Sequence, residues 1–308
     1  MEFPEGKHFA FSILDDTDDS TVENAKPIYD LLYDLGFKTT KTVWATDCPE
    51  GSPLFFAGQT LQNQDYLQFV HILGQRGFEL AWHGATMESS KRARTIKALE
   101  FFHSEFGYFP TVHCNHGHNL ENIYWGINRY RNQLFRQLIR LVSNRKEQFS
   151  GEQESSPYFW GDLCKQHIRF VRNFTFSELD MLKCDPCMPY HLDDRPYVNY
   201  WFSTTDAPDV TRFNDLLNRS RLDQLSNDGG VCIISTHLGK GFVRNGEVNK
   251  GVRSTLEYLS TLGGWYVPVS DILELLLKET SNGKISRLGQ FGMEWRHLVD
   301  HARERIKR

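Results

Sequence analysis

One segment near the N-terminus limits the possible folds more than any other part of the sequence. Phe9–Leu14 is an almost wholly apolar run of the kind found in buried parallel strands. Four carboxylates follow it within five positions: Asp15, Asp16, Asp18 and Asp19. Like charges this close repel one another, and burial at a strand end raises the cost unless a cation compensates it. We therefore weigh two interpretations, a solvated acidic loop that interacts with a helix dipole and a cation-binding site.

The same segment predicts the first unit of an α/β fold. Ser20-x-x-Glu23 has the form of a capping box, and the apolar spacing after it predicts a helix over Val22–Leu35. Further strands are predicted over 42–46, 78–82, 110–118 with its exit loop, 168–171, 198–202 and 231–235. Helices are predicted over 66–76, 89–106, 210–225, 255–262 and 269–278.

This alternation implies a parallel sheet with right-handed crossovers. About seven strand–helix units over residues 1–308 predict a single domain with a closed or nearly closed barrel. The regular rhythm is lost between residues 119 and 158, which we interpret as an elaborated connection. In such a barrel, functional side chains are expected at the carboxyl ends of the strands.

Composition and charge exclude several classes of protein. The formal net charge of −4 argues against a broad nucleic-acid-binding surface. No apolar run approaches the ~20 residues of a membrane-spanning helix, and the N-terminus lacks the features of a signal peptide. We therefore expect a cytoplasmic protein without a transmembrane segment, whose six cysteines are reduced. The oligomeric state stays open.

Acids and imidazoles gather at the predicted strand ends. They are Asp15, Asp16, Asp47, His83, the cluster from His113 to His118, Asp206 and His237. Several such groups at one mouth are difficult to explain by stability alone. They suit a divalent metal ion together with a general acid and base. Mixed imidazole and carboxylate ligation fits Zn²⁺ best, with Co²⁺, Ni²⁺ or Mn²⁺ as other candidates.

Over most of the chain, the order of motifs resembles that of the polysaccharide deacetylases, the NodB-homology carbohydrate esterases of family four. The matching segments are Leu14-Asp15-Asp16, Gly77-Phe-Glu-Leu-Ala-Trp-His83, Ile234-Ser-Thr-His237 and Gly264-Trp-Tyr-Val-Pro-Val-Ser-Asp271. The resemblance implies an α/β fold of the distorted (β/α)7 barrel type. It also implies that Asp15 is the catalytic base, that Asp16 and His83 bind the metal, and that His237 is the general acid.

The chain departs from the family pattern at the second metal-binding histidine, where Met87 stands instead. A thioether is a poor ligand for such an ion. His113 occupies the position of the family's arginine and is the leading candidate for the third ligand, ahead of His116 and His118. The family's Asp-Trp motif has no clean match, and Asp206 is its positional counterpart. We assign substrate contacts to Asp18, Asn115, His116, His118 and Asp206.

The resemblance and the strand-end residues together predict a metal-dependent deacetylase. Its expected substrate is an acylated amino sugar, with N-acetyl as the expected acyl group, in cell-surface polysaccharide metabolism. The cytoplasmic expectation favours a nucleotide-linked or lipid-linked sugar over a wall polymer. Two alternatives remain: a metal-free, non-catalytic carbohydrate-binding protein on the same scaffold, and a metal-dependent amidase for another acyl or formyl amide.

Overall fold

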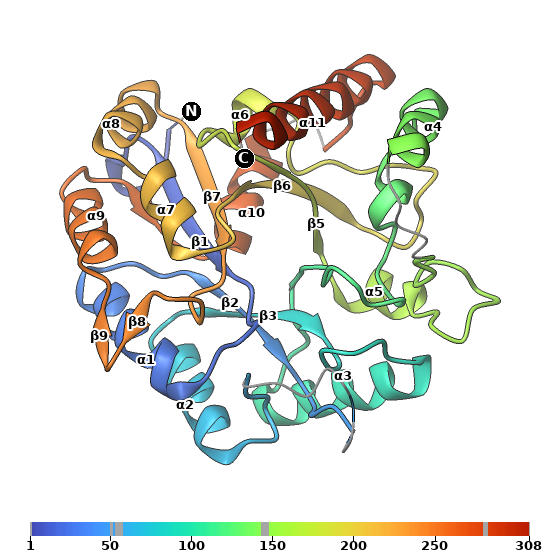
Figure 1. The fold of residues 1–308 in the computed structure, drawn as a ribbon, viewed down its shortest axis with the longest axis horizontal. Coiled ribbons are helices and arrows are strands. Elements are labelled where there is room, and N and C mark those ends of the chain that lie inside the picture. Colours follow the sequence, from blue (N-terminus) through green and yellow to red (C-terminus); the bar gives the residue numbers. More distant parts are fainter. Residues whose placement is uncertain (1, 50–51, 53–57, 143–147, 280–282, 308) are drawn as a thin grey trace.

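The computed structural model describes residues 2–49, 52, 58–142, 148–279 and 283–307. Seven parallel strands form a closed barrel surrounded by helices (Figure 1). The strands are β1 Ala10–Asp15, β2 Thr40–Trp44, β3 Glu79–Gly84, β4 Val112–His113, β5 Phe170–Phe176, β6 Tyr200–Asp206 and β7 Val231–Thr236. The predicted distorted (β/α)7 barrel is confirmed.

The barrel closes between its first and last strands. β1 pairs with β7 along its whole length, from Ala10 opposite Val231 to Asp15 opposite Thr236. On its other side β1 pairs with two strands. The first residues of β1 pair with β10 (Trp265–Tyr266), and the last residues of β1 pair with β2. This arrangement opens a wedge between β1 and β2 that β10 fills, and it is one source of the barrel's distortion.

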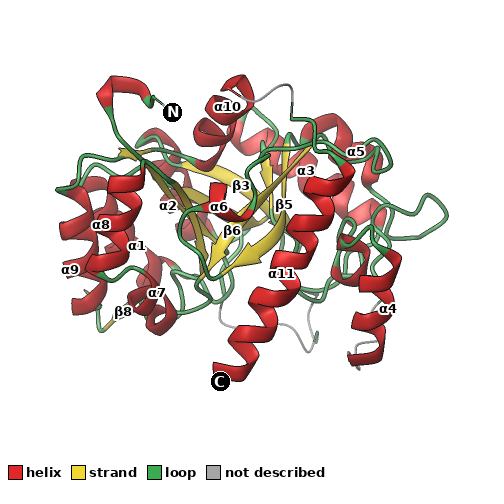
Figure 2. Ribbon diagram, turned by 90° about the horizontal axis from the view of Figure 1, so that it is seen from above, coloured by secondary structure: helices red, strands yellow, loops and turns green. Residues whose placement is uncertain are grey.

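Helices cover the outside of the barrel, as Figure 2 shows from a second direction. The main helices around the barrel are α1 Val22–Asp34, α2 Gln64–Gln75, α3 Arg92–Phe106, α7 Val210–Leu216, α8 Arg219–Asp228, α9 Lys250–Ser260 and α10 Val269–Glu279. The remaining elements are η1 Pro4–Gly6, η2 Gly126–Arg129, α4 Gln133–Val142, α5 Gly161–His167, α6 Met181–Cys184, the hairpin β8 Val243–Arg244 and β9 Glu247–Val248, and α11 Arg287–Lys307. Among the described residues, no helix combines the length and apolarity needed to cross a bilayer.

α1 begins at Val22 as predicted, but its N-cap differs from the prediction by one residue. Thr21, not Ser20, is the N-cap, and its capping box is completed by the side chain of Asn24 instead of Glu23. The hydroxyl of Ser20 is turned inward and accepts a hydrogen bond from Lys41. A tertiary partner for Ser20 therefore overrides the local capping signal.

Other helix and strand boundaries also differ from the predicted ones. The predicted helix over 210–225 is observed as two helices, α7 and α8. The side chain of Asn218 accepts a hydrogen bond from the backbone N–H of Arg221 and thereby caps the start of α8. β5 and β6 each extend several residues further than their apolar runs, as far as Phe176 and Asp206. In its described residues, the connection from β4 to β5 contains three short helices, η2, α4 and α5, instead of one crossover helix.

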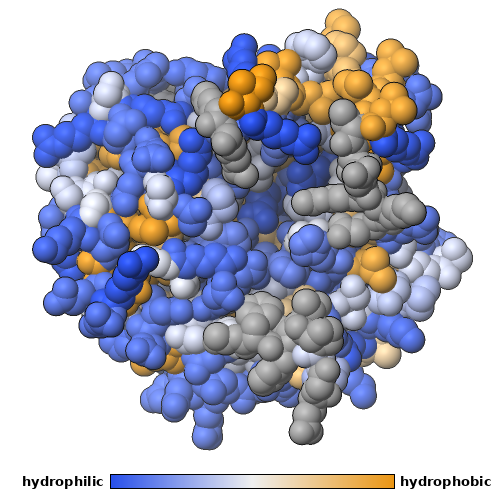
Figure 3. Space-filling model, viewed as in Figure 1, coloured by the Kyte–Doolittle hydropathy of each residue, from blue (hydrophilic) through white to orange (hydrophobic). Residues whose placement is uncertain are grey.

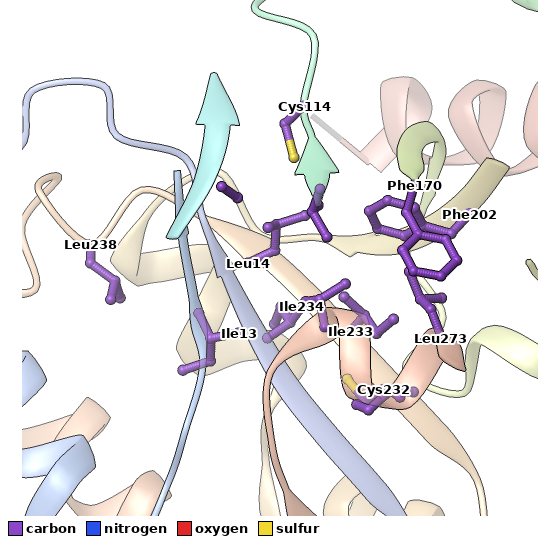
Figure 4. Close-up of a cluster of buried hydrophobic side chains, with 14 of the residues drawn as sticks. Ile13, Leu14, Cys114, Phe170, Phe202, Cys232, Ile233, Ile234, Leu238 and Leu273 are labelled. Atoms are coloured by element: carbon purple, nitrogen blue, oxygen red, sulfur yellow. The ribbon is translucent and has the colours of Figure 1, made fainter. Parts of the chain in front are cut away.

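Aliphatic and aromatic side chains from several strands meet in the core. Figure 4 shows this cluster, drawn from β1, β5, β6, β7 and α10. The labelled members include Leu14, Phe170, Phe202, Ile233 and Leu273, all 0% exposed. This apolar packing holds the strand ends in place around the polar residues that follow them.

Candidate active site

The first acid of the cluster is sealed inside the protein. Asp15 and Lys41 are opposite each other in the β1–β2 register, and their charged atoms lie 2.8 Å apart with neither side chain exposed. Asp15 also accepts hydrogen bonds from Tyr29 on α1 and from the backbone N–H of Leu238. Its carboxylate therefore points toward the helix layer and away from the barrel interior. The sequence-based assignment of Asp15 as the catalytic base is revised accordingly.

Asp16 points the other way, as the alternation of a strand requires. Its Oδ2 lies 2.6 Å from the Arg172 guanidinium of β5, and its Oδ1 lies 3.9 Å from Nδ1 of His83. Burial by itself would raise the pKa of Asp16, but the charges of Arg172, His83 and His237 and the hydrogen bond from Arg172 together lower it. Oδ1 is buried and has no hydrogen-bond partner among the described residues.

Asp18 is the centre of the cluster. Its Oδ1 lies 3.5 Å from Nε2 of His83 and 3.6 Å from Nε2 of His116. Its Oδ2 lies 3.2 Å from Nε2 of His237 and 3.8 Å from the Lys240 ammonium. Burial opposes ionisation, yet the interactions with His237 and His83 hold the pKa of Asp18 well below its usual range. Four side chains thus converge on this one carboxylate.

His237 follows β7 and is held at both ring nitrogens. Nδ1 donates to the backbone carbonyl of Pro208 at 2.7 Å, and Nε2 faces Asp18. Burial acts to lower the pKa of His237, but the contact with Asp18 and the charge of Asp16 raise it overall. The imidazolium form of His237, with a proton at Nε2, is therefore favoured beside the acids.

Two loops are locked together to build this arrangement. The side-chain amide of Asn24 donates to the carbonyls of both Asp19 and Gly239, so it joins the loop after β1 to the loop after β7. A Cβ on Gly239 would lie 2.8 Å from the backbone of Asp19, which only glycine permits. This close approach places Asp18 against His237.

His113 does not join the cluster. Its Nδ1 contacts the carbonyl of Trp82 and its Nε2 contacts Oδ1 of Asn115, each at 3.0 Å. Asn115 is itself fixed by two hydrogen bonds with the backbone of Ile123. Burial lowers the pKa of His113 to about 4. Because both ring nitrogens are already engaged, we revise the assignment of His113 as third ligand; Met87 packs against Trp44 and Cys48.

His116 lies beside Asp18 and His83, where sequence analysis expected His113 as the third metal ligand. It follows β4, its ring lies against those of His83 and Trp44, and its Nε2 faces Asp18. His118 stands farther out on the same loop and is exposed. Of the substrate contacts predicted from sequence, Asp18 and His116 thus lie in the centre of the site.

The cluster opens into a cavity of about 300 Å³. It is lined by Asp16, Asp18, His83, Asn115, His116, Gly117, His118, Trp125, Arg129, Arg172, Thr175, Asp206, Pro208, Ser235 and His237. Burial raises the pKa of Asp206 despite the nearby Arg172. Asp15, Asp47 and His113 do not line this cavity. Sequence analysis missed Trp125, Arg129 and Arg172, which belong to no motif.

The carboxylate and imidazole side chains at the site are of the chemical types that bind a divalent metal ion. Within the described parts of the chain, no three His, Cys, Asp or Glu side chains are already arranged to hold one. However, Oδ1 of Asp18 and both ring nitrogens of His83 are buried without a hydrogen-bond partner there. A carboxylate with two imidazoles, here Asp18, His83 and His116, is a donor set that zinc accepts. A bound ion would need a small adjustment of these side chains.

The comparisons with solved structures agree with this barrel. The chain superposes on a Mycobacterium smegmatis protein classed as a polysaccharide deacetylase, with a TM-score of 0.52, 11% identity, and coverage of 93% of this chain and 96% of that one. The chain has the polysaccharide deacetylase fold. A PuuE allantoinase gives a TM-score of 0.52, 12% identity and coverage of 91% and 94%.

A third structure of this kind is classed as a polysaccharide deacetylase from Pseudomonas aeruginosa PAO1, with a TM-score of 0.50, 10% identity and coverage of 91% and 94%. At such low identities the likeness establishes the fold and leaves the chemistry to the site. A scan against protein-family models and a search of curated proteins each found no match.

The buried pair predicts a large stability effect. Lys41→Met leaves Asp15 charged, buried and without its cation, so we expect a loss of about 3–5 kcal/mol in the free energy of unfolding. Urea denaturation followed by circular dichroism measures this. Lys26→Met, which removes the exposed partner of Asp30, is the control and should cost under about 1 kcal/mol. Equal effects of the two substitutions would show that Lys41 does not neutralise a buried charge.

Proposed function

We propose that this protein is a metal-dependent hydrolase that removes an acyl group, with N-acetyl as the first choice, from an amino sugar. The observation that carries the proposal is the Asp18 cluster, in which a buried carboxylate and three imidazoles meet beside the Asp16–Arg172 pair. The cluster opens into a cavity at the carboxyl ends of the strands, on a fold that polysaccharide deacetylases share. These features together support membership of that family.

In this proposal Asp18, His83 and His116 hold the ion. A divalent ion there, with Zn²⁺ preferred over Co²⁺, Ni²⁺ or Mn²⁺, would supply Lewis-acid chemistry, namely polarisation of the acyl carbonyl and a lower pKa of water at the site. The ligand set is one carboxylate and two histidines, as the sequence predicted, but two of its three members differ. The change follows from the contacts of Asp16 and His113 with other partners.

The chain's own groups then supply the proton transfers. Asp16 is ionised, fixed by Arg172 and has a free Oδ1, so it can accept the proton of the attacking water. His237 is oriented by Pro208 and can donate the proton at Nε2 to the departing amine, which cannot leave as an anion. The base thus moves from Asp15 to Asp16, whereas the acid remains His237.

Other residues of the cavity suit a sugar. The indole of Trp125 offers an apolar face, and the guanidinium of Arg129 lies 3.4 Å from the centre of that ring. His118 and Asp206 supply polar groups at the rim and wall, whereas the amide of Asn115 is engaged by His113 and Ile123 and only shapes the wall. We keep a nucleotide-linked or lipid-linked amino sugar as the expected substrate and the cytoplasm as the expected compartment. All six cysteines lie in the described residues and none is in a disulfide bond, which supports that compartment.

A second candidate, a metal-free carbohydrate-binding protein, is favoured by a different observation. Every acid after β1 faces a cation of the protein: Asp15 faces Lys41, Asp16 faces Arg172, and Asp18 and Asp19 lie near Lys240. With the imidazolium of His237 beside Asp18 as the fourth cationic group, the four carboxylates are balanced without a metal. An amidase for another acyl or formyl group would use the same site as the deacetylase, and a substrate panel separates those two.

Metal content tests the first proposal against the second. Protein purified without chelator, or dialysed against zinc, cobalt, nickel or manganese, should carry roughly one ion per chain by elemental analysis. Asp18→Asn and His83→Ala should each lose that ion, and His113→Gln should keep it. An ion-free wild type under all these conditions would support the binding protein. Loss of the ion in His113→Gln would restore the ligand that the sequence indicated.

The acid and base are tested by kinetics on N-acetylated and N-formylated amino sugars. Asp16→Asn and His237→Ala should each lower kcat by roughly 10²–10⁴-fold, the usual contribution of a positioned acid or base, with KM much less affected. Asp19→Asn, in the same loop but half-exposed, is the matched control and should retain kcat within a few-fold. A metal-replete Asp16→Asn with full kcat would show that Asp16 is not the base.

A further inference from the structure

Two helices outside the barrel expose an unusual amount of apolar surface. Seven of the nine large apolar side chains that are exposed in the described residues lie on α4 or α11. We call six of them the α4–α11 ridge: Leu134, Leu138, Leu141, Leu288, Phe291 and Trp295. Their exposed fractions range from 46% for Phe291 to 86% for Leu141. Figure 3 shows apolar residues gathered over these helices at the upper right.

The ridge is a built surface and not a scatter of single residues. On each helix its three side chains follow the i, i+3 or i+4, i+7 spacing that places them in one stripe. The two stripes are joined by the buried Phe135, whose ring stacks on Phe291 and also contacts Trp295. The outer parts of both stripes pack against neither the barrel core nor each other and remain exposed.

Near the ridge, the acidic side chains of α11 are paired within the protein, whereas several arginines are not. The acids of α11 are bound to the protein: Glu294 accepts from the backbone of Arg131, Asp300 from Ser177, and Glu304 pairs with Arg212. Exposed arginines without an ion-pair partner in the described parts of the chain remain: Arg140, Arg287, Arg303 and Arg305. A chain with a net charge of −4 therefore presents a cationic surface here.

Leucine and aromatic side chains flanked by arginines match the boundary of an anionic bilayer, where apolar groups enter the acyl region and arginines meet the headgroups. A short stretch of chain connects the ridge to the cavity. η2 leads into α4 and supplies Arg129 to the cavity lining, next to Trp125. We propose that the α4–α11 ridge binds the surface of an anionic lipid bilayer and thereby holds the cavity beside the membrane.

A cavity held beside a membrane narrows the range of possible substrates. If the proposed hydrolase activity holds, on which this step rests, the substrate is an amino sugar attached to a lipid carrier, with its headgroup entering the cavity from the membrane. A sugar carried by a nucleotide would not require the ridge.

Vesicle flotation of the full chain tests the membrane proposal without any need for turnover. The protein should float with phosphatidylcholine vesicles containing one third phosphatidylglycerol, and much less with pure phosphatidylcholine. Leu138→Gln combined with Leu141→Gln should weaken binding by about tenfold or more. Arg140→Gln combined with Arg287→Gln should remove most of the dependence on anionic lipid and on salt. All these residues are exposed, and thermal unfolding checks that the variants are folded.

Two controls separate the possible outcomes. Tyr108→Gln removes an exposed aromatic side chain outside the ridge and should bind vesicles like wild type. Asp16→Asn should also bind like wild type, so a failure of the proposed chemistry leaves the vesicle result intact. A folded wild type that ignores anionic vesicles would overturn the proposal. So would a dimer in sedimentation velocity that the leucine variants dissociate, because a second copy would then cover the ridge.

Discussion

The structure depends on how four carboxylates at the end of one strand are neutralised. Each is matched by a cation that arrives from elsewhere in the fold: Lys41 from β2, Arg172 from β5, and Lys240 with His237 from the loop after β7. Without these cations, the repulsion and desolvation of the acids would oppose the barrel. The end of β1 is therefore tied to three other parts of the barrel by the same contacts that form the candidate site.

The alternation of side chains along β1 divides the acids into two roles. Asp15 faces the helix layer, where it accepts from Tyr29 and Lys41 and has no access to the cavity. Asp16 faces the barrel interior, where one of its oxygens is held by Arg172 and the other has no hydrogen-bond partner in the described parts of the chain. Successive side chains of an extended chain point to opposite faces, and Asp15 and Asp16 follow this alternation here. A stabilising acid next to a reactive one follows from this geometry.

The elaborated connection and the C-terminal helix link the site to the surface. η2 brings Arg129 into the cavity, and α4 continues directly from it to the exposed ridge. α11 completes the ridge through the contact of Phe135 with Phe291 and Trp295. The barrel supplies the chemistry in our proposals, whereas these additional helices decide where the cavity is presented.

Much of the fold of this protein is determined by its local sequence. The period of apolar residues predicted the seven strands and most helices, and the strand-end positions of Asp16, His83 and His237 placed them at one mouth. What the sequence did not decide was which atoms meet. The contacts between Asp18 and His116 and between Asp16 and Arg172 join residues 98 and 156 positions apart. Such pairings depend on barrel closure, register and the direction of each side chain, which only the tertiary structure determines.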